Sequence, residues 1–515
     1  MIANLRLNSN ATLKILFALL VWSLLILRFG YRFGTGDQVE VLPYTLWLQD
    51  SSLYPHDFVI QALASSVPNE RTAIAYLLLP FVNHLEVACL IFHCLFTVIL
   101  ILGLMKLAEM FIQNKYFAWL SIPAALIVFN DFALGNLELY NHCLQASLIA
   151  VAIIGWAILY FFQGKYLHFI SLMSIASIMH GLEGLDVMLV LGIILLILIY
   201  QKKISLSKFF LLCGIYLGTA GIYLLALFFA KQGNTDISNT ELFEILFRFR
   251  HPHHFIFLSF PKFKMVVFFL LTLFSMWYFR NRSPILFRFM LIGFIGILLY
   301  AISVDGFQNI FIANFQLYRI TTWMKFFGVV AVVAWIERFV SFVSLSHLFV
   351  SFGKSFLLIS ITDCWIVILS FNQMLPYKVP FELFSLKENN EMISICQEIK
   401  NVTPKDALFI QPFDNSELKY YAERSSYVEF KANVHDKKYV REWYKRIQLV
   451  YGLDIEDSQK GFGLKKIADD NFALDSDRLK ALKLEGVTHM LVEKGYHPPI
   501  GELIVSNNSY AVYQL

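Results

Sequence analysis

Long apolar segments recur through the first 373 of the chain's 515 residues, and they leave little choice of fold. A helix needs roughly 20 mostly apolar residues to cross the hydrocarbon core of a bilayer. Charged residues make up 16% of the chain, against roughly 25% in soluble domains. We therefore expect an α-helical polytopic membrane protein with about 11 transmembrane helices. The expected spans are 12–29, 86–105, 116–130, 143–162, 166–180, 184–200, 207–230, 265–279, 285–303, 317–336 and 355–373.

The basic residues predict how these spans are oriented. If the N-terminus is cytoplasmic, the inside loops carry nearly all of the loop Lys and Arg residues, which is the positive-inside pattern. This orientation treats 72–82 as a short helix at the membrane interface, because Asn83, His84 and Glu86 interrupt the apolar stretch. If 72–82 crossed the membrane as a span of its own, the orientation of everything after it would be inverted.

The chain is expected to divide into a membrane domain, 1–373, a linker, 374–386, and an extracytoplasmic domain, 387–515. In this last part the charge rises and helix and strand patterns alternate, which predicts a small α/β domain with a partly parallel sheet. Helices are expected in 388–404, 436–452 and 476–486, strands in 406–412, 425–432 and 487–495, and a hairpin in 503–515.

Carboxylates gather directly after the first span, in the expected outside loop 30–71. Asp37 and Glu40 stand three residues apart and share a face if the segment is helical, and Asp57 follows. A carboxylate here could act as a general base, or hold a divalent cation (Mg or Mn) against a phosphate leaving group. For each acid alone an ordinary solvated side chain or helix cap is the better explanation. For the cluster, prolines and aromatic residues that indicate an ordered loop favour a function.

A second polar cluster, HGLEGLD, lies between two expected spans and contains His180 and Glu183. Ionisable groups at the ends of spans are costly unless they are hydrated or used. Capping of the helix ends explains them equally well. If the cluster has a function, His180 and Glu183 are the pair that we expect to bind substrate.

Arginines on the outside form a third group of candidates, because the positive-inside pattern disfavours them there. Arg248, Arg250 and His251 stand together in FRFRHPHHF, and Arg319 follows a later amide-rich loop. Guanidinium groups match phosphate oxygens in paired hydrogen bonds, so a lipid-linked phosphate or pyrophosphate is the predicted ligand. Ordinary anionic lipid is the alternative. Metal binding by the three histidines is less favoured, since Pro252 separates them.

This layout resembles the GT-C class of membrane glycosyltransferases, and the block GDQVEVLPYTLWLQDSSLYPHDF carries the resemblance. The resemblance implies transfer of a sugar from a polyprenyl-phosphate donor to a glycan, lipid or protein acceptor at the outer face. It also implies that Asp37 is the catalytic acid, with Glu40 and Asp57 as fallbacks. The acceptor class stays open, because the first loop lacks the acidic doublet of protein mannosyltransferases and the tail lacks the WWD-type motif of oligosaccharyltransferases.

The chain is also similar to a family of bacterial multi-pass proteins of unknown activity, on the same block and on residues 403–452. This similarity implies the bacterial inner (plasma) membrane, and the distribution of Lys and Arg predicts a cytoplasmic N-terminus. Two other functions are considered: a transporter or flippase of lipid-linked glycans, and a non-catalytic envelope scaffold. Because the polar clusters fall at one membrane face rather than near its midplane, the glycosyltransferase is favoured. No nucleic-acid partner is expected, since the net charge is only +4 and the basic residues follow the membrane topology.

Overall fold

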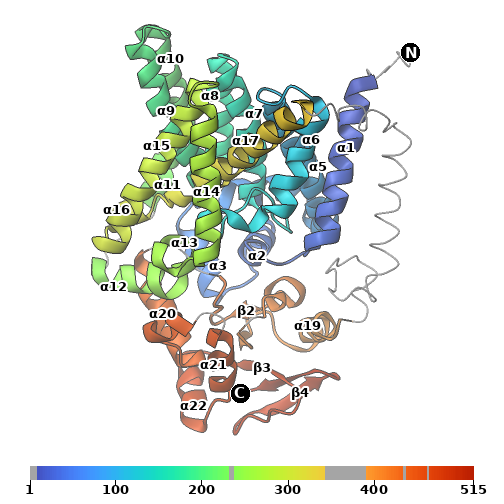
Figure 1. Ribbon diagram of the computed structural model, residues 1–515. Coiled ribbons are helices and arrows are strands. Elements are labelled where there is room, and N and C mark those ends of the chain that lie inside the picture. The colour runs from blue at the N-terminus through green and yellow to red at the C-terminus, as the bar shows by residue number, and fades with distance from the viewer. Residues whose placement is uncertain (1–8, 231–236, 343–389, 414, 433–436, 461–462) are drawn as a thin grey trace. The chain divides into compact units, whose positions relative to one another are not determined.

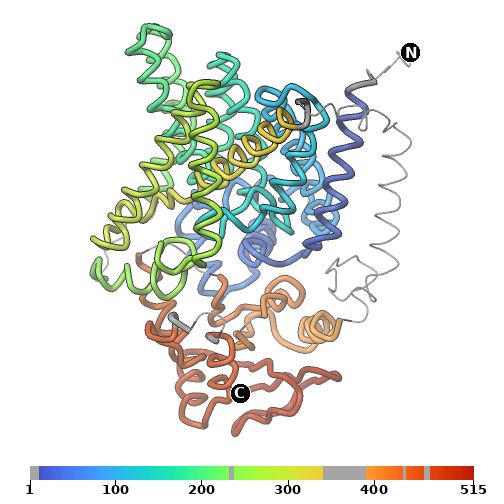
Figure 2. Tube along the Cα trace, viewed as in Figure 1, coloured from blue at the N-terminus to red at the C-terminus, as the bar shows by residue number. Residues whose placement is uncertain are grey.

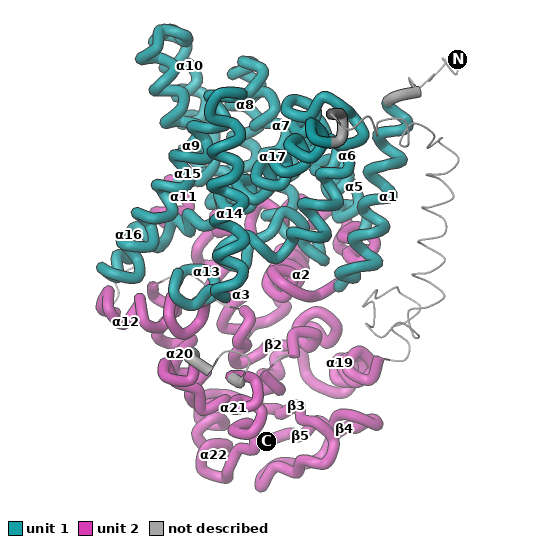
Figure 3. Tube along the Cα trace, viewed as in Figure 1, with its two compact units in different colours: residues 1–32, 90–224, 253–381 teal, residues 33–89, 225–252, 382–515 magenta. Residues whose placement is uncertain are grey.

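The computed structural model describes residues 9–230, 237–342, 390–413, 415–432, 437–460 and 463–515 (Figure 1). The expected span 355–373 and the linker 374–386 lie outside the described residues. The chain is mostly helical and ends in a small five-stranded sheet. It forms two compact units, each built from separate segments (Figure 3). Unit 1 comprises 1–32, 90–224 and 253–381, and unit 2 comprises 33–89, 225–252 and 382–515.

Seven helical stretches of the described residues are long and apolar enough to cross a membrane. They are Ala11–Phe29, Thr72–Ala108, Gly181–Tyr200, Leu206–Ala230, Lys262–Phe279, Pro284–Gly306 and Ile310–Phe339, and shorter apolar helices cover Lys115–Val128, Ala146–Phe162 and Tyr166–Met179. These stretches follow the first ten expected spans in order. Large apolar side chains such as Phe210, Phe263 and Leu270 are more than half exposed, as lipid-facing side chains are. The total of 11 spans stays a prediction.

Unit 1 is a bundle of apolar helices. Its elements are α1 (Ser9–Phe29), α5 (Leu85–Ala108), α6 (Lys115–Pro123), η2 (Ala124–Val128), η3 (Asn130–Phe132), η4 (Leu134–Asn136), α7 (Ala146–Phe162), α8 (Tyr166–Met179), α9 (Gly181–Tyr200), α10 (Leu206–Tyr216), η5 (Leu217–Gly221), α13 (Pro252–Phe255), η7 (Phe257–Ser259), α14 (Lys262–Phe279), α15 (Pro284–Ala301), η8 (Ile302–Gly306), α16 (Ile310–Ala313), η9 (Leu317–Arg319) and α17 (Ile320–Phe342). The unit boundary falls within α11 (Ile222–Ala230), most of which belongs to unit 2.

A close approach fixes the first turns of α9 against α8. A Cβ atom on Gly184 would lie 2.6 Å from the Cα of Ser177, so only glycine fits here. The Ser177 hydroxyl is itself held at 2.9 Å from the Tyr216 hydroxyl. Polar side chains on this part of α9 therefore have well-defined positions.

Unit 2 combines segment 33–89, which contains most of the expected outside loop 30–71, with 225–252 and the tail. Its elements are α2 (Gln38–Gln49), α3 (Phe58–Ser65), α4 (Thr72–Leu78), η1 (Leu79–His84), α12 (Asn239–Phe243), η6 (Glu244–Arg250), α19 (Glu391–Val402), β1 (Leu408–Ile410), η12 (Leu418–Ala422), β2 (Ser425–Ser426), α20 (Lys437–Tyr451), η13 (Ile455–Lys460), α21 (Gly463–Asn471), α22 (Ser476–Leu484), β3 (His489–Glu493), β4 (Glu502–Ser506) and β5 (Tyr510–Gln514).

The helical stretch after the first loop is interrupted at η1. Phe81 leaves the helical region, with φ −112° and ψ 18°, and α5 begins at Leu85. The expected interruption near 83–86 is therefore found, slightly earlier along the chain. Because the whole stretch Thr72–Ala108 is apolar enough to count as one candidate span, the interfacial position of 72–82 stays a prediction.

The tail contains the expected partly parallel sheet, in the order β2-β1-β3-β5-β4. Strand β1 pairs in parallel with β2 and β3, and β3, β5 and β4 pair antiparallel at the C-terminal end (Figure 2). The amphipathic helix α19 packs its apolar face on this sheet through Ile395 and Ile399, against Phe409 and Leu491. The strand expected in 425–432 is much shorter, since only Ser425 and Ser426 pair.

The first loop and the tail of unit 2 share a buried core. Val39, Tyr44 and Ile60 from the loop pack with Ala432 from the tail. The hydroxyl of Tyr54, which is fully buried, donates to the carbonyl oxygen of Lys419 at 2.7 Å. Segment 33–89 is thus packed in the same unit as the sheet, and these contacts fix the positions of its acidic residues.

Candidate functional site

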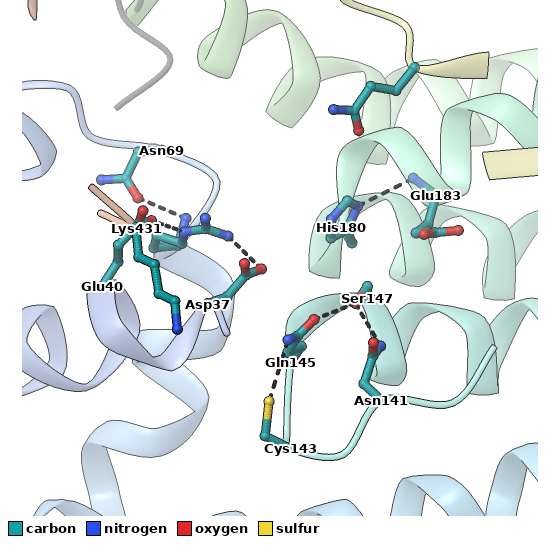
Figure 4. Close-up of polar contacts among 12 residues, drawn as sticks. Asp37, Glu40, Asn69, Asn141, Cys143, Gln145, Ser147, His180, Glu183 and Lys431 are labelled. Carbon is teal, nitrogen blue, oxygen red and sulfur yellow. Dashed lines mark hydrogen bonds and ion pairs between the residues drawn. The ribbon is translucent and has the colours of Figure 1, made fainter. Parts of the chain in front are cut away.

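Two of the predicted acids converge on one arginine. Arg71 Nη1 lies 2.8 Å from Asp37 Oδ2, and Arg71 Nε lies 2.6 Å from Glu40 Oε2. Asp37 and Glu40 lie together at the start of α2 (Figure 4), as their spacing predicts. The Glu40 side chain is 5% exposed and that of Asp37 is 33% exposed. Of the two carboxylates, Asp37 is therefore the one that a substrate can reach.

Local structure holds this cluster in place. Gly34 and Gly36 adopt positive φ values, 75° and 59°, and turn the chain into α2. On the other side, Asn69 Oδ1 accepts from the backbone N–H of Arg71 at 2.9 Å. The Asn69 amide donates to the carbonyl oxygen of Leu63 at 2.9 Å. Burial alone would lower the pKa of Arg71, but the charges of Asp37 and Glu40 raise it above its usual value. Arg71 is therefore a permanent cation in this cluster.

Arg250 brings a second guanidinium group to the same unit. Its Nη2 donates to the carbonyl oxygen of Lys431 at 2.9 Å, and its guanidinium lies 4.6 Å from the ring centre of Phe430. Its buried Nε finds no hydrogen-bond partner among the described residues. Burial lowers the pKa of Arg250 to about 10, and the nearby charges of Asp37 and Glu40 partly offset this. Arg250 is thus positively charged at neutral pH, and its Nε–H group can donate a hydrogen bond to an anion.

Asp57, the third predicted acid, has a capping position instead. Its Oδ1 accepts from the N–H groups of Val59 and Ile60, at 3.1 and 3.0 Å, and so caps α3. Its Oδ2 accepts from the N–H of Ser426 at 2.9 Å. The side chain is fully buried. Because both of its carboxylate oxygens are used in these contacts, we assign Asp57 a structural role rather than a catalytic one.

A buried ionic network surrounds Asp57. Lys419 Nζ lies 2.7 Å from Glu429 Oε2 and 3.9 Å from Asp57 Oδ1. Gln411 Nε2 donates to Glu429 Oε1 at 2.9 Å. Burial raises the pKa of Glu429 to about 7, although Lys419 acts in the opposite direction. The network joins loop and tail through charges rather than through apolar contacts alone.

A polar cavity of about 720 Å³ lies in unit 2, near the C-terminal end of α2. Such a volume is typical of small-molecule sites. Tyr421 and Glu86 meet across it, with the hydroxyl 3.4 Å from Oε1. The lining residues are Leu46, Gln49, Val82, Asn83, Glu86, Ile393, Ser394, Gln397, Lys400, Tyr420, Tyr421 and Glu423. Tyrosines, amides and charged groups in one cavity are suited to a polyhydroxylated ligand, because they offer flat apolar faces and many hydrogen bonds.

The predicted pair in HGLEGLD lies in unit 1. His180 is the N-cap of α9, and its Nδ1 accepts from the N–H of Glu183 at 3.3 Å (Figure 4). Glu183 Oε1 lies 2.6 Å from Arg319 Nη1. Arg319 also donates from Nε and Nη2 to Gln316 Oε1, at 2.9 and 2.5 Å. His180, Glu183 and Arg319 therefore belong to one cluster within unit 1.

The two remaining predicted residues, Arg248 and His251, have local contacts. Arg248 Nη1 pairs with Glu244 Oε1 at 2.8 Å, one turn away on η6, and its side chain is 43% exposed. His251 ends η6, and its backbone N–H donates to the carbonyl oxygen of Leu246 at 3.1 Å. Arg248 therefore differs from Arg250, whose Nε atom is buried.

Several charged residues escaped the sequence reasoning. Arg71, Lys419 and Glu429 in unit 2 and Lys325 in unit 1 all form buried ion pairs. The amine of Lys325 pairs with Glu138, whose pKa burial raises to about 7 despite the lysine. One signal could have found Arg71, since it too is an arginine in an expected outside loop.

Comparison with known proteins covers only part of the tail. Residues 390–450 match a family described as "Domain of unknown function (DUF6798)". The matched segment includes α19 and contributes seven of the cavity residues, from Ile393 to Glu423. A search of curated proteins found no relative of this chain.

Proposed function

We propose that this chain is a membrane glycosyltransferase that moves a sugar from a polyprenyl-phosphate donor to an acceptor at the extracytoplasmic face. The observation that carries the proposal is the cluster of Asp37, Glu40 and Arg71, with the charge of Arg250 close enough to act on it. It combines a partly exposed carboxylate, Asp37, with a guanidinium, Arg250, whose Nε has no hydrogen-bond partner among the described residues. General-base catalysis and stabilisation of a phosphate leaving group need these two elements.

In the proposed reaction, Asp37 accepts the proton of an acceptor hydroxyl. The hydroxyl oxygen forms a bond to the anomeric carbon, and the bond from that carbon to the donor phosphate oxygen breaks. The electron pair leaves with the polyprenyl phosphate, and Arg250 offsets its charge. Arg71 orients Asp37 through a contact of 2.8 Å. Glu40 balances the charge of Arg71 and is a positioning residue.

The same carboxylates are the residues that would hold a divalent cation. Their oxygens match the preference of Mg or Mn. Arg71 Nη1 and Nε, however, already engage one oxygen of each acid, which supplies positive charge at the point where a cation would lie. The donor set therefore fits a guanidinium better than a resident metal, and we derive no step through a metal ion. Loss of activity on chelation, restored by Mg or Mn, would reverse this assignment.

The polar cavity supplies a place for the acceptor. Asp37 precedes the first turn of α2, and Leu46 and Gln49 border the cavity at the last turn. At 1.5 Å per residue, these points lie about 14–18 Å apart along the helix. An extended glycan acceptor can span that distance. We therefore propose a glycan acceptor in preference to a lipid or a protein.

Donor turnover tests this proposal directly. The purified protein in nanodiscs would be given a panel of polyprenyl-phosphate sugars, and the release of polyprenyl phosphate followed by mass spectrometry. We expect Asp37→Asn to reduce release by about 10²–10⁴-fold, the usual contribution of a general base. Asp50→Asn is the matched control, because Asp50 is an exposed acid at the other end of α2. Full release by Asp37→Asn would remove Asp37 from the mechanism.

The topology belongs to the same proposal: 11 spans in the bacterial inner membrane, a cytoplasmic N-terminus and an extracytoplasmic tail. Reporter fusions after residues 203 and 400 should give opposite signals, since these positions fall on opposite sides. Opposite signals in the reverse sense, with 203 outside and 400 in the cytoplasm, would mean that 72–82 crosses the membrane and that everything after it is inverted. Matching signals would mean that the number of spans between these two positions differs from the proposed one.

Transport of a lipid-linked glycan is the second candidate, and one observation favours it. Glu183 and Arg319 pair at or near membrane-length helices of unit 1, where charged groups commonly mark transport pathways. If the wild-type protein moved a lipid-linked glycan across liposome membranes without releasing polyprenyl phosphate, transport would replace transfer. A non-catalytic envelope scaffold would show neither activity.

A further inference from the structure

The cluster in unit 1 carries more negative than positive charge. Asp186 lies one turn beyond Glu183 on α9 and is fully buried. The charges that act on it are those of Arg319 and Glu183. Arg319 is engaged by Glu183 and Gln316. Two carboxylates thus face one guanidinium, and an excess negative charge lies within the bundle.

Three carboxylate oxygens of this cluster have no hydrogen-bond donor among the described residues. They are both oxygens of Asp186 and Oε2 of Glu183, and all three are buried. Residues three apart on a helix lie roughly 5–6 Å apart at Cβ, so these oxygens can act on one ligand. A buried carboxylate that has no hydrogen-bond donor and shares its one counter-charge with a second carboxylate is strongly unfavourable, and a bound cation relieves this cost.

We propose that Asp186 and Glu183 form a binding site for one monovalent cation, either a proton or Na⁺. One positive charge brings the cluster to neutrality, whereas a divalent ion would leave it with an excess positive charge. Three other ionisable groups are nearby: His180, Tyr300 of α15, on which the charge of Asp186 acts, and Tyr318 of η9, which adjoins Tyr300. His180 accepts the Glu183 N–H at Nδ1, and an imidazole that accepts at one ring nitrogen is neutral. Neither tyrosine supplies a charge at neutral pH. This inference stands apart from the proposed glycosyl transfer.

Carbodiimide labelling tests the site on the intact protein. N,N′-dicyclohexylcarbodiimide modifies protonated carboxyl groups in apolar surroundings, and peptide mass spectrometry locates the product. In sodium-free buffer we expect Asp186 to be modified at acidic pH and progressively less as the pH rises. Asp131→Asn is the control, because Asp131 is an exposed acid of the same unit and its loss should leave labelling of Asp186 unchanged.

The ion is identified by replacing choline chloride with sodium chloride at constant pH. Protection of Asp186 by sodium assigns the site to Na⁺, and equal labelling in both salts assigns it to the proton. Either result supports a cation site. Absence of modification at every pH in sodium-free buffer, together with an Asp186→Asn variant that melts at the wild-type temperature, would overturn it.

Glu183→Gln tests the charge count itself. This substitution removes one carboxylate and releases Arg319 Nη1, which then becomes available to Asp186. Labelling of Asp186 should fall several-fold, because a carboxylate paired with an arginine remains ionised. Unchanged labelling in this variant would show that the excess charge is not what makes Asp186 bind a cation.

Discussion

Each unit holds a largely buried arginine that pairs with a carboxylate, and the two clusters differ in net charge. In unit 2, Arg71 engages both Asp37 and Glu40, and Arg250 adds a second positive charge. In unit 1, Arg319 engages Glu183 but forms no hydrogen bond with the second acid, Asp186. Counted over these groups, the first cluster is neutral and its Asp37 is partly exposed, whereas the second is negative and both of its acids are buried.

This difference bears on what each cluster can do. A neutral cluster with a partly exposed carboxylate can receive a large substrate and return unchanged after each turnover. A negative cluster whose carboxylates are buried is suited to a small cation. The two kinds of function therefore separate by exposure and net charge, although the residue types are the same.

Removing the arginine gives the largest expected effect. Arg319→Ala leaves two buried acids without a counter-charge, and Arg71→Ala leaves Asp37 and Glu40 facing each other. Breaking a buried pair costs about 3–5 kcal/mol, and we expect the larger loss for Arg319, whose partners are more buried. Thermal unfolding in detergent measures both. If Arg71→Ala proved the more destabilising, the acids of unit 2 rather than those of unit 1 would depend more on their arginine.

The lysine–carboxylate pairs extend the comparison to pH. Glu429 beside Lys419 and Glu138 beside Lys325 each have a pKa of about 7 in the folded protein, because burial disfavours their charged forms. The usual value for glutamate is about 4.3. Between these values the folded state binds more protons than the unfolded state, so the free energy of unfolding falls as the pH rises through the window.

Glu429→Gln and Glu138→Gln should each reduce the pH dependence of the free energy of unfolding, because each removes one of the two titrating carboxyl groups. Each is expected to change the difference in unfolding free energy between about pH 5 and pH 8 by on the order of 1–3 kcal/mol. Glu485→Gln, an exposed position in the tail, is the control. A wild-type protein whose stability rises with pH across this window would show that both carboxylates are already ionised when folded.

Sequence reasoning found what is local. Hydropathy located the helices of unit 1, and periodicity located α19, α20, α22 and the strands β1 and β3 to β5, because these patterns need only neighbouring residues. Strand β2 was predicted to be longer than it is: it ends at Ser426, and Glu429, three residues later, is buried and pairs with Lys419. A buried ionic contact of this kind leaves no periodic signal.

The site shows the same division. The spacing of Asp37 and Glu40 predicted that they share a face, but their partner Arg71 lies more than 30 residues away and could be identified only from the fold. Asp57 stood in the same acidic loop, and its capping role depends on the local turn and on Ser426 in the tail. Asp186 sat in the same motif as Glu183, yet only the contacts of Arg319 reveal that it lacks a donor.

Arg250→Lys tests whether the cluster of unit 2 binds the donor phosphate. A lysine keeps the charge but loses the paired donors of the guanidinium. We expect affinity for a polyprenyl-phosphate sugar in nanodiscs to fall by about tenfold, which is about 1.4 kcal/mol. Arg250→Ala should weaken it further. Equal affinity in the wild type and both variants would leave Arg250 as a structural contact to Phe430 and Lys431.

Arg248→Ala gives the smallest expected effect and separates two arginines that the sequence placed together. Arg248 is 43% exposed and pairs with Glu244 one turn away on η6, and such surface pairs contribute about 0.3–0.5 kcal/mol. Its loss should barely change the melting temperature and should leave donor affinity at the wild-type value, while Arg250→Ala lowers that affinity. If Arg248→Ala and Arg250→Ala lowered donor affinity equally, both arginines would contact the donor phosphate, whatever their exposure. The exposed face of η6 would then belong to the site, as the sequence motif alone suggested.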